Sequence, residues 1–306
     1  MAVLRASNPK AGGAQVVSGG ALCDRLCRRE NEMHAQTTDP IRTAVVGLGA
    51  IGTTLARKLG ENAVPGIKLV AVSARDSDKA ARFSGSLGED VKVVPISDLP
   101  KVADLVIECA PAAILEQIAR PMLEAGKKVM VLSVGALLSH PELLNLAKSH
   151  RGQIIVPTGA LLGLDAVSAA AEGIIYSVRM KTTKPPRGLV GAPYLEEHKI
   201  DLSGIDKPTK VFEGTAREAA KGFPANLNVA VALSLAGIGP DRTVLEIWAD
   251  PKIERNMHQI SVEADSASFE MTIRNIPSDN PKTGKITPLS AIAALRKLGA
   301  PLRVGS

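Results

Sequence analysis

Short apolar runs alternate with longer segments of helical periodicity from about residue 43 to residue 157 of the chain. The apolar runs are rich in valine and isoleucine, which is typical of parallel strands that are buried on both faces. We expect strands at 43–46, 68–75, 91–94, 104–110, 128–133 and 153–157, and helices at 53–59, 79–83, 112–125 and 141–149. This alternation predicts an α/β fold with a Rossmann-type, doubly wound parallel sheet and ligands at the carboxyl ends of its strands.

From residue 166 onward the pattern is that of strands with one solvent-exposed face, interrupted by isolated helices. We expect strands at 177–182, 210–214, 243–249, 260–264 and 268–274, a loop at 184–188, and helices at 166–171, 215–221, 228–235 and 288–298. This order predicts a second domain of α+β class, built on a largely antiparallel sheet.

The expected domain organisation follows from these two patterns. Residues 41–165 form a dinucleotide-binding Rossmann domain, and residues 166–285 form an α+β domain for catalysis, substrate binding and oligomerisation. The last helix, within 286–306, packs back on the first domain. Residues 1–40 show no sustained periodicity, and we interpret them as a mostly disordered extension.

Two other interpretations of the extension stay open. It mixes small and basic residues like a targeting peptide, although Asp24, Glu30 and Glu32 are unusual in transit peptides, which are poor in acids. Alternatively, translation begins at Met33 and the preceding residues are upstream sequence.

Three glycines follow the first expected strand in the spacing G-x-G-x-x-G. The first permits a tight turn, the second lets the backbone approach a pyrophosphate, and the third allows the helix to pack closely on the strand. The helix that follows directs unpaired N–H groups and the positive end of its dipole at the anion. We therefore expect this turn to bind NAD or NADP through Gly47, Gly49, Ala50, Ile51 and Gly52.

The end of the second strand bears on the choice between NAD and NADP. NAD-preferring domains place an acidic residue there to bind the ribose 2′-hydroxyl, whereas this strand ends in Ser73-Ala-Arg75 with Asp76 one position later. Arg75 can pair with a 2′-phosphate, so we expect NADP to be accepted. A solvated loop arginine is an equal alternative.

Small residues lie at the carboxyl ends of three further strands, at Cys109-Ala110, 133–136 and Gly159-Ala160. Because parallel strands end at one edge of the sheet, we expect Cys109 and Ala110 to lie at the cofactor. Cys109 is interpreted as a small buried hydrophobe rather than a nucleophile, since no histidine is near it in the sequence.

Composition narrows the classes of function. The net charge of +6 is spread along the chain and aromatic residues make up only 2%, which favours small anionic ligands over nucleic acid. The chain has no run of apolar residues long enough to predict a membrane span. The 3 cysteines suit neither a disulfide framework nor a metal site, which favours a reducing, cytoplasmic compartment and no bound metal.

One polar cluster in the second domain is a candidate catalytic site. The amides of Asn226 and Asn228 begin an expected helix, and His258 lies between two expected strands. Judged from the residues alone, His258 is either a site histidine or a structural one.

From about Thr43 to the C-terminus, a series of motifs resembles the L-aspartate dehydrogenase family, and the motifs occur in the same order. They lie at 47–52, 133–137, 157–160, 163–165, 226–230, 233–237, 241–243, 249–251, 256–258 and 280–283. The resemblance implies NAD(P)-dependent oxidative deamination of L-aspartate to iminoaspartate, which water hydrolyses to oxaloacetate and ammonia. Iminoaspartate can instead feed quinolinate and pyridine nucleotide synthesis. The resemblance also implies that His258 is the active-site histidine and that Ala160 and Asn228 contact the cofactor. Family members often carry Lys where Ala225 stands, so a charged contact near the site is in question.

Such a reaction needs a proton acceptor and donors for two substrate carboxylates. His258, titrating near neutrality, would accept or relay the proton. Asn226, Lys282 and Thr283 are candidate substrate contacts, with a solvated turn as the alternative for the last two. We also expect a homodimer or homotetramer, because the second sheet needs cover on its other face.

Two other classes of function remain as alternatives. One is a related two-domain NAD(P)H reductase, similar to dihydrodipicolinate reductase or homoserine dehydrogenase. The other is a non-catalytic sensor that binds NAD(P) and reports to a partner.

Overall fold

The computed structural model describes residues 39–88, 90–224, 227–278 and 284–305. The fold below is that of the unit Pro40–Ser306. The expectations for the N-terminal extension and Met33 therefore fall outside the described residues.

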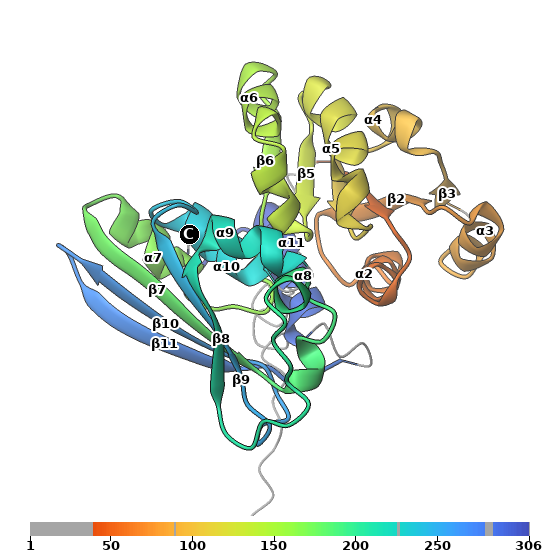
Figure 1. The fold of residues 1–306 in the computed structure, drawn as a ribbon. Coiled ribbons are helices and arrows are strands. Elements are labelled where there is room, and N and C mark those ends of the chain that lie inside the picture. Colours follow the sequence, from red (N-terminus) through yellow and green to blue (C-terminus); the bar gives the residue numbers. More distant parts are fainter. Residues whose placement is uncertain (1–38, 89, 225–226, 279–283, 306) are drawn as a thin grey trace, which may run out of the picture. The chain divides into compact units, whose positions relative to one another are not determined.

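The first sheet has six parallel strands in the order β3-β2-β1-β4-β5-β6 (Figure 1). Its strands are β1 (Ile41–Val46), β2 (Ile67–Ser73), β3 (Lys92–Val93), β4 (Leu105–Glu108), β5 (Lys128–Val131) and β6 (Gln153–Ile155). The strand order reverses direction between β1 and β4, which creates the crevice where doubly wound sheets bind nucleotides. The predicted Rossmann-type sheet is confirmed.

Helices cover both faces of this sheet, so its strands alternate between two apolar clusters. Val45 packs into one cluster with Leu55 of helix α2, whereas Ala44 and Val46 pack into the other with Ile118 of helix α5. The helices of this part are α2 (Ala50–Gly60), α3 (Ser77–Gly85), α4 (Leu99–Val102), α5 (Leu115–Glu124) and α6 (Glu142–Ser149).

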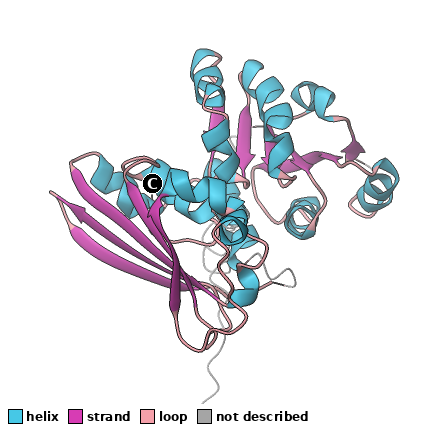
Figure 2. Ribbon diagram, viewed as in Figure 1, coloured by secondary structure: helices cyan, strands magenta, loops and turns pink. Residues whose placement is uncertain are grey.

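The second sheet has five strands in the order β11-β10-β7-β9-β8 (Figure 2). The β7–β9 pair is parallel and the other three pairs are antiparallel, so the sheet is mixed but mostly antiparallel, as predicted. Its strands are β7 (Ile175–Lys184), β8 (Thr209–Thr215), β9 (Thr243–Ala249), β10 (Met257–Ala264) and β11 (Ser268–Arg274).

Helices α7 (Leu164–Ala171), α8 (Pro193–Glu197), α9 (Ala216–Gly222) and α10 (Asn228–Ala236) belong to this second part. Alternate residues of the strands, such as Val178, Met180 and Ile260, join Val231 of α10 in one core. Thr215 caps α9 through a complete capping box with Glu218.

The last helix, α11 (Ile286–Gly299), contacts α2 and β2 of the first sheet. Ala291 and Leu295 are fully buried there in the same cluster as Leu55. Gly66 adopts a positive φ of 75°, and a Cβ on it would lie 3.1 Å from the Cα of Gly299. This close approach fixes the helix beside the start of β2.

Two local expectations were wrong, and one short helix was not predicted. A loop was predicted at 184–188, but Lys184 is the last residue of β7, and Pro186–Gly188 forms a short 3₁₀ helix. Strand β10 begins at Met257 rather than at residue 260, so His258 lies within a strand. Helix α8 was not anticipated, because its five residues are too few to display helical periodicity.

Candidate functional site

The glycine turn has the geometry that a bound pyrophosphate requires. Gly47 has φ +92°, and a Cβ on it would lie 2.6 Å from the carbonyl oxygen of Cys109. A Cβ on Gly52 would lie 1.8 Å from the carbonyl oxygen of Gly47, so both positions require glycine. By contrast, no heavy atom lies within 4 Å of a Cβ built on Gly49, which leaves open space where helix α2 begins.

That open space faces an uncapped helix N-terminus. Gly49 is the N-cap residue of α2 and supplies no side chain, so the first N–H groups of the helix have no side-chain acceptor. Unpaired N–H groups and the helix dipole favour an anion there. The turn therefore fits the pyrophosphate of NAD(P), with Ala50 and Ile51 in the first turn of α2.

A buried carboxylate ties together the ends of two strands beside this turn. Glu108 ends β4 and accepts hydrogen bonds from the backbone N–H groups of Ala110 (2.9 Å), Leu132 (3.2 Å) and Ser133 (2.9 Å). The Ser133 hydroxyl donates a fourth, at 2.6 Å. Burial nevertheless raises the pKa of Glu108, since desolvation outweighs these four donors. The carboxylate fixes the backbone at the cofactor edge of β4 and β5.

Side chains of the second part of the chain hold the loops of the first. Asn228, the first residue of α10, accepts a hydrogen bond from the Gly135 N–H at 3.0 Å through Oδ1. Asn275 donates from Nδ2 to the Ala160 carbonyl at 2.9 Å. The two residues that the family resemblance links to the cofactor, Ala160 and Asn228, therefore lie at the junction of the two sheets.

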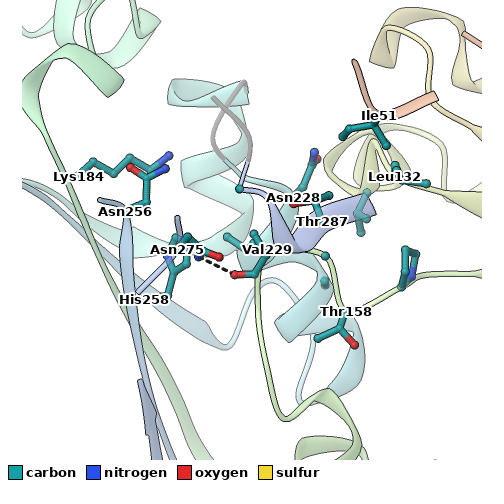
Figure 3. Close-up of a pocket in the computed structure, with 16 residues that line it drawn as sticks. Ile51, Leu132, Thr158, Lys184, Asn228, Val229, Asn256, His258, Asn275 and Thr287 are labelled. Atoms are coloured by element: carbon teal, nitrogen blue, oxygen red, sulfur yellow. Dashed lines mark hydrogen bonds between the residues drawn. The ribbon is translucent and has the colours of Figure 1, made fainter. Parts of the chain in front are cut away.

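A pocket opens at this junction (Figure 3). Ile51, Leu132 and Val134 line it from the first sheet, while residues of β7, β10 and α10 line it from the second. Its described lining also includes Pro157, Thr158, Gly159, Ala160, Lys184, Asn228, Val229, Ala232, Asn256, His258, Asn275, Gly284 and Thr287. The predicted catalytic histidine and three of the predicted cofactor residues, Ile51, Ala160 and Asn228, thus line one pocket.

His258 is buried in the wall of this pocket, with 3% of its surface exposed. Its Nδ1 lies 3.1 Å from the Thr182 hydroxyl, directly across the β7–β10 pair. Burial, and secondarily the charge of Lys184, lower the pKa of His258 to about 3. The expectation that this imidazole titrates near neutrality is therefore wrong. At neutral pH the ring is uncharged, so one nitrogen can donate a hydrogen bond and the other can accept one.

Lys184 is the residue of this wall that the sequence analysis missed. It is 5% exposed, lines the pocket, and has its pKa lowered to about 8 by burial. The signal was present in the alternation of Val178, Met180, Thr182 and Lys184, which share one face of β7. A proline directly after Lys184 suggested a loop and obscured that pattern.

Asn275 is a second residue that was missed. It follows β11, is 4% exposed, and its backbone N–H donates to the Asn256 carbonyl at 2.8 Å. Among the described residues, its Oδ1 is one of two buried side-chain oxygens without a hydrogen-bond partner. A buried acceptor of this kind in a pocket wall is suited to a ligand N–H.

The remaining predicted site residues have mixed placements. Arg75 is exposed just beyond the end of β2. Burial raises the pKa of the Cys109 thiol, so it stays protonated and packs as a small hydrophobe. Asn226, Lys282 and Thr283 lie outside the described residues, as does Ala225.

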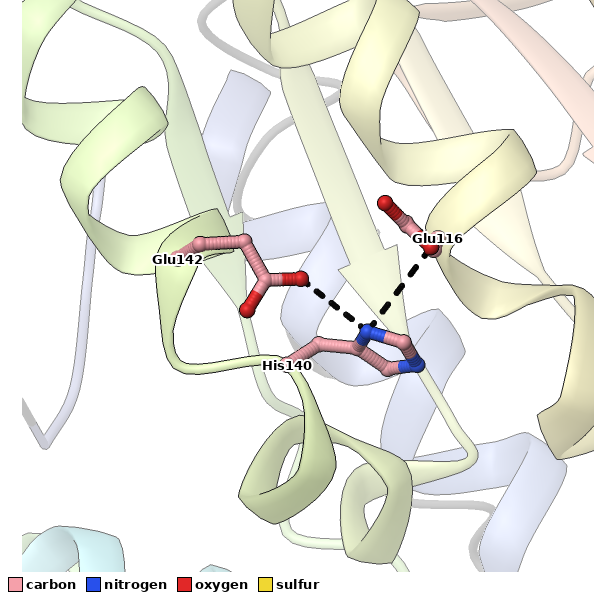
Figure 4. A group of neighbouring side chains, drawn as sticks. All are labelled: Glu116, His140 and Glu142. Atoms are coloured by element: carbon pink, nitrogen blue, oxygen red, sulfur yellow. Dashed lines mark hydrogen bonds and ion pairs between the residues drawn. The ribbon is translucent and has the colours of Figure 1, made fainter.

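One acidic group lies on α5 and α6, outside the described pocket lining (Figure 4). His140 Nδ1 is 3.1 Å from Glu142 and 4.0 Å from Glu116. The guanidinium of Arg120 lies 2.7 Å from the same Glu116. Because an arginine already neutralises these carboxylates, the arrangement is that of a surface ion-pair network.

None of the described helices is long and apolar enough to cross a membrane.

A dinucleotide turn and a polar pocket at the junction of two sheets define a two-domain, NAD(P)-dependent dehydrogenase. The family model described as "Homoserine dehydrogenase, NAD binding domain" matches residues 47–157, and "Aspartate dehydrogenase, C-terminal" matches residues 165–298. L-aspartate dehydrogenase 3 of Bordetella bronchiseptica is 60% identical over 88% of this chain and 98% of the relative. L-aspartate dehydrogenase of Bradyrhizobium diazoefficiens is 55% identical over 91% of this chain and 99% of the relative.

The chain belongs to the L-aspartate dehydrogenase family. The crystal structure of aspartate dehydrogenase from Thermotoga maritima has the same fold, with a TM-score of 0.65 and 24% identity over 87% of this chain and all of that one.

Proposed function

We propose that the protein catalyses the NAD(P)-dependent oxidative deamination of L-aspartate. The substrate loses two electrons and two protons, as a hydride from Cα and a proton from its amino group, to give iminoaspartate. Water then displaces ammonia to give oxaloacetate, and the sequence is reversible. The observation that carries this proposal is the pocket itself, in which the dinucleotide edge of one sheet meets His258 and Lys184 of the other. The relatives named as L-aspartate dehydrogenases support the choice of substrate.

The cofactor is assigned to the residues at the carboxyl edge of the first sheet. Gly47, Gly49 and Gly52 shape the pyrophosphate site, and Asn228 and Ala160 bound the pocket beside it. When bound, NAD(P)⁺ supplies the two-electron acceptor for the Cα–H bond of the substrate. Glu108 holds the adjoining backbone through its four hydrogen bonds.

His258 is assigned to proton transfer. Thr182 contacts Nδ1, so Nε2 is the ring nitrogen that we assign to the substrate amine or the attacking water. A neutral imidazole can accept a proton there. An anionic substrate beside it raises the pKa of His258 toward the working range, because a nearby negative charge favours the imidazolium.

Asn275 is assigned to the substrate amine. Its Nδ2 is held by the Ala160 carbonyl, which leaves the buried Oδ1 as an acceptor in the pocket wall. An amine N–H satisfies such an acceptor at little cost. Asn226, Lys282 and Thr283 remain predicted substrate contacts that the described residues do not test.

We further propose a cytoplasmic homodimer or homotetramer that supplies iminoaspartate for quinolinate and pyridine nucleotide synthesis. Less exposed and more exposed residues alternate along β9 and β11, so one face of the second sheet is open, and this supports a second copy that covers that open face. Size-exclusion chromatography with light scattering tests the assembly, and a monomer at micromolar concentration would contradict it.

The activity is tested with purified protein and a panel of substrates. L-aspartate, other amino acids and several 2-oxo acids with ammonia are assayed with NAD(H) and NADP(H) by absorbance of the reduced coenzyme. We expect reduction of coenzyme with L-aspartate and oxidation with oxaloacetate plus ammonia. Activity on a different panel member would identify a related reductase, and tight coenzyme binding without turnover would favour a sensor.

A further inference from the structure

Lys184 is the last residue of β7 on the face that packs against the core. Val178, Met180 and Thr182 precede it at two-residue spacing, and all three are buried. This face therefore changes from apolar to polar over its last two positions. An ammonium buried in the wall of a pocket interacts more strongly with a ligand charge than one on the surface, because solvent screens it less.

The polar end of this face is shared by two strands. Thr182 lies opposite His258 and Thr183 opposite Met257 in the antiparallel pair, so the register brings Lys184 toward Asn256. Lys184, Asn256 and His258 all line the pocket. The sheet thus presents an ammonium, an amide and an imidazole to one ligand.

The pocket has two chemically different ends. Ile51 and Leu132 line it at the dinucleotide edge, whereas Lys184 and Asn256 lie with His258 on the opposite side of the pocket in the view of Figure 3. Within the part of the lining that the structure describes, Lys184 alone carries a full charge. The end of the pocket away from the dinucleotide is therefore positive.

We propose that Lys184 selects a dicarboxylic amino acid by binding the carboxylate farthest from the carbon that is oxidised. The inference rests on the proposed amino-acid oxidation at this site and adds the residue that distinguishes aspartate from a neutral amino acid. A buried ammonium recognises a carboxylate with a charge-assisted hydrogen bond, which is stronger than the hydrogen bond to a neutral amide of the same shape. Lys184 is thus a specificity-determining residue for the reaction.

The test compares L-aspartate with its isosteric amide, L-asparagine, in the wild type and in Lys184→Met. We expect the substitution to lower kcat/KM for aspartate roughly 30-fold to several thousand-fold, as for one partner of a buried charge pair. Asparagine should lose far less, so the aspartate-to-asparagine ratio collapses while the dissociation constant of NADH is unchanged. An equal loss for both substrates, or a ratio that is retained, would overturn the proposal.

Lys181→Met is the matched control. Lys181 lies on the same strand with its ammonium 4.2 Å from the centre of the Trp248 ring, outside the described pocket lining. The variant removes the same charge, so it reports the effect of net charge and strand stability alone. We expect it to keep the wild-type ratio.

A binding measurement keeps the proposal separate from turnover. Calorimetry on the wild-type protein and on Lys184→Met, each with NADH, compares succinate, a four-carbon dicarboxylate, with its monoamide succinamate. We expect the wild type to bind succinate at least tenfold more tightly. If succinate is preferred by the wild type, the preference is lost in Lys184→Met, and no panel member is oxidised, the proposed function fails while Lys184 still binds the carboxylate. Equal binding, or no binding of either, overturns the role of Lys184.

Discussion

Thr182 and His258 face each other across the β7–β10 pair, with the threonine hydroxyl 3.1 Å from Nδ1 of the imidazole. Both side chains are buried, at 3% exposure each. One ring nitrogen is therefore held by the strand next to it, and the ring plane is fixed relative to the pocket. This contact orients the group on which proton transfer depends.

The first prediction concerns His258. His258→Ala should lower turnover of L-aspartate by roughly 10²–10⁴-fold, as expected for loss of a general base, while the protein still binds NADH. Steady-state kinetics and a fluorescence titration with NADH measure the two quantities. His198→Ala is the control, because that ring stacks on Tyr194 at an exposed position. Near-normal turnover in a folded His258 variant would remove the histidine from the mechanism.

The second prediction concerns the pH dependence of stability. Burial lowers the pKa of Lys184 from 10.5 to about 8, so the unfolded chain binds more protons than the folded chain between these values. The buried ammonium thus lowers the free energy of unfolding below pH 8, and this cost disappears as the pH rises to 10.5. Lys184→Met should stabilise the protein by up to about 3 kcal/mol at neutral pH and by little above pH 10.5.

Urea denaturation at the two pH values measures this difference. The substitution also removes a positive charge near His258, so the pKa of that imidazole should rise. A variant that is less stable at neutral pH would mean that contacts of the ammonium outweigh its desolvation. We therefore expect Lys184→Met to be more stable and less selective for aspartate than the wild type, because residues of binding sites often lower the stability of the folded protein.

The third prediction concerns Glu108. Three donors bind Oε2 of Glu108 and the Ala110 N–H binds Oε1, so Glu108→Gln can keep its oxygen at the Oε2 position but then turns its NH₂ toward the Ala110 N–H, which loses its acceptor. We expect a loss of about 1–3 kcal/mol in unfolding free energy and a raised KM for the coenzyme. Ser133→Ala, which removes one donor, should cost about 1 kcal/mol. If Glu108→Gln binds the coenzyme normally, the amide is an adequate substitute for the side chain, which would mean that Glu108 is a protonated carboxyl group in the native state.

The fourth prediction separates two glycines of the dinucleotide turn. Gly52→Ala would place a methyl 1.8 Å from the Gly47 carbonyl oxygen, so the strand and helix must move apart and thermal stability should fall. Gly49→Ala meets no heavy atom within 4 Å, so stability should change by no more than about 1 kcal/mol. The methyl fills the space assigned to the pyrophosphate, and NADH should bind at least tenfold more weakly. Calorimetry that finds unchanged affinity in Gly49→Ala would move the pyrophosphate elsewhere.

The sheets could be predicted because the burial of a strand on one or both faces determines the spacing of its apolar residues in the sequence. Residues 44–46 of β1 and 105–107 of β4 are consecutive buried apolar residues, since helices cover both faces, and β9 alternates because one face is open. The glycine turn was predictable for a local reason, the close approach of Gly47 to Gly52 within one strand–turn–helix unit.

The far wall of the pocket could not be predicted in this way. Lys184 and His258 are 74 residues apart in sequence, and only the β7–β10 register brings their strands together. The same holds for Asn275, whose partner is the carbonyl of Ala160. The depressed pKa of His258 likewise depends on burial by segments remote in sequence, which no local pattern records.

The last prediction concerns the choice of coenzyme. Arg75 is exposed beyond β2, while the Asp76 carboxylate accepts the Lys79 N–H at 2.9 Å as the cap of α3. The acidic group is thus partly engaged by its own helix, and the cation beside it can meet a 2′-phosphate. Arg75→Ala should raise KM for NADP about 10- to 100-fold and change KM for NAD by less than about threefold. Arg82→Ala on helix α3 is the control for the loss of one positive charge. An unchanged KM for NADP in Arg75→Ala would mean that Arg75 is a solvated loop residue.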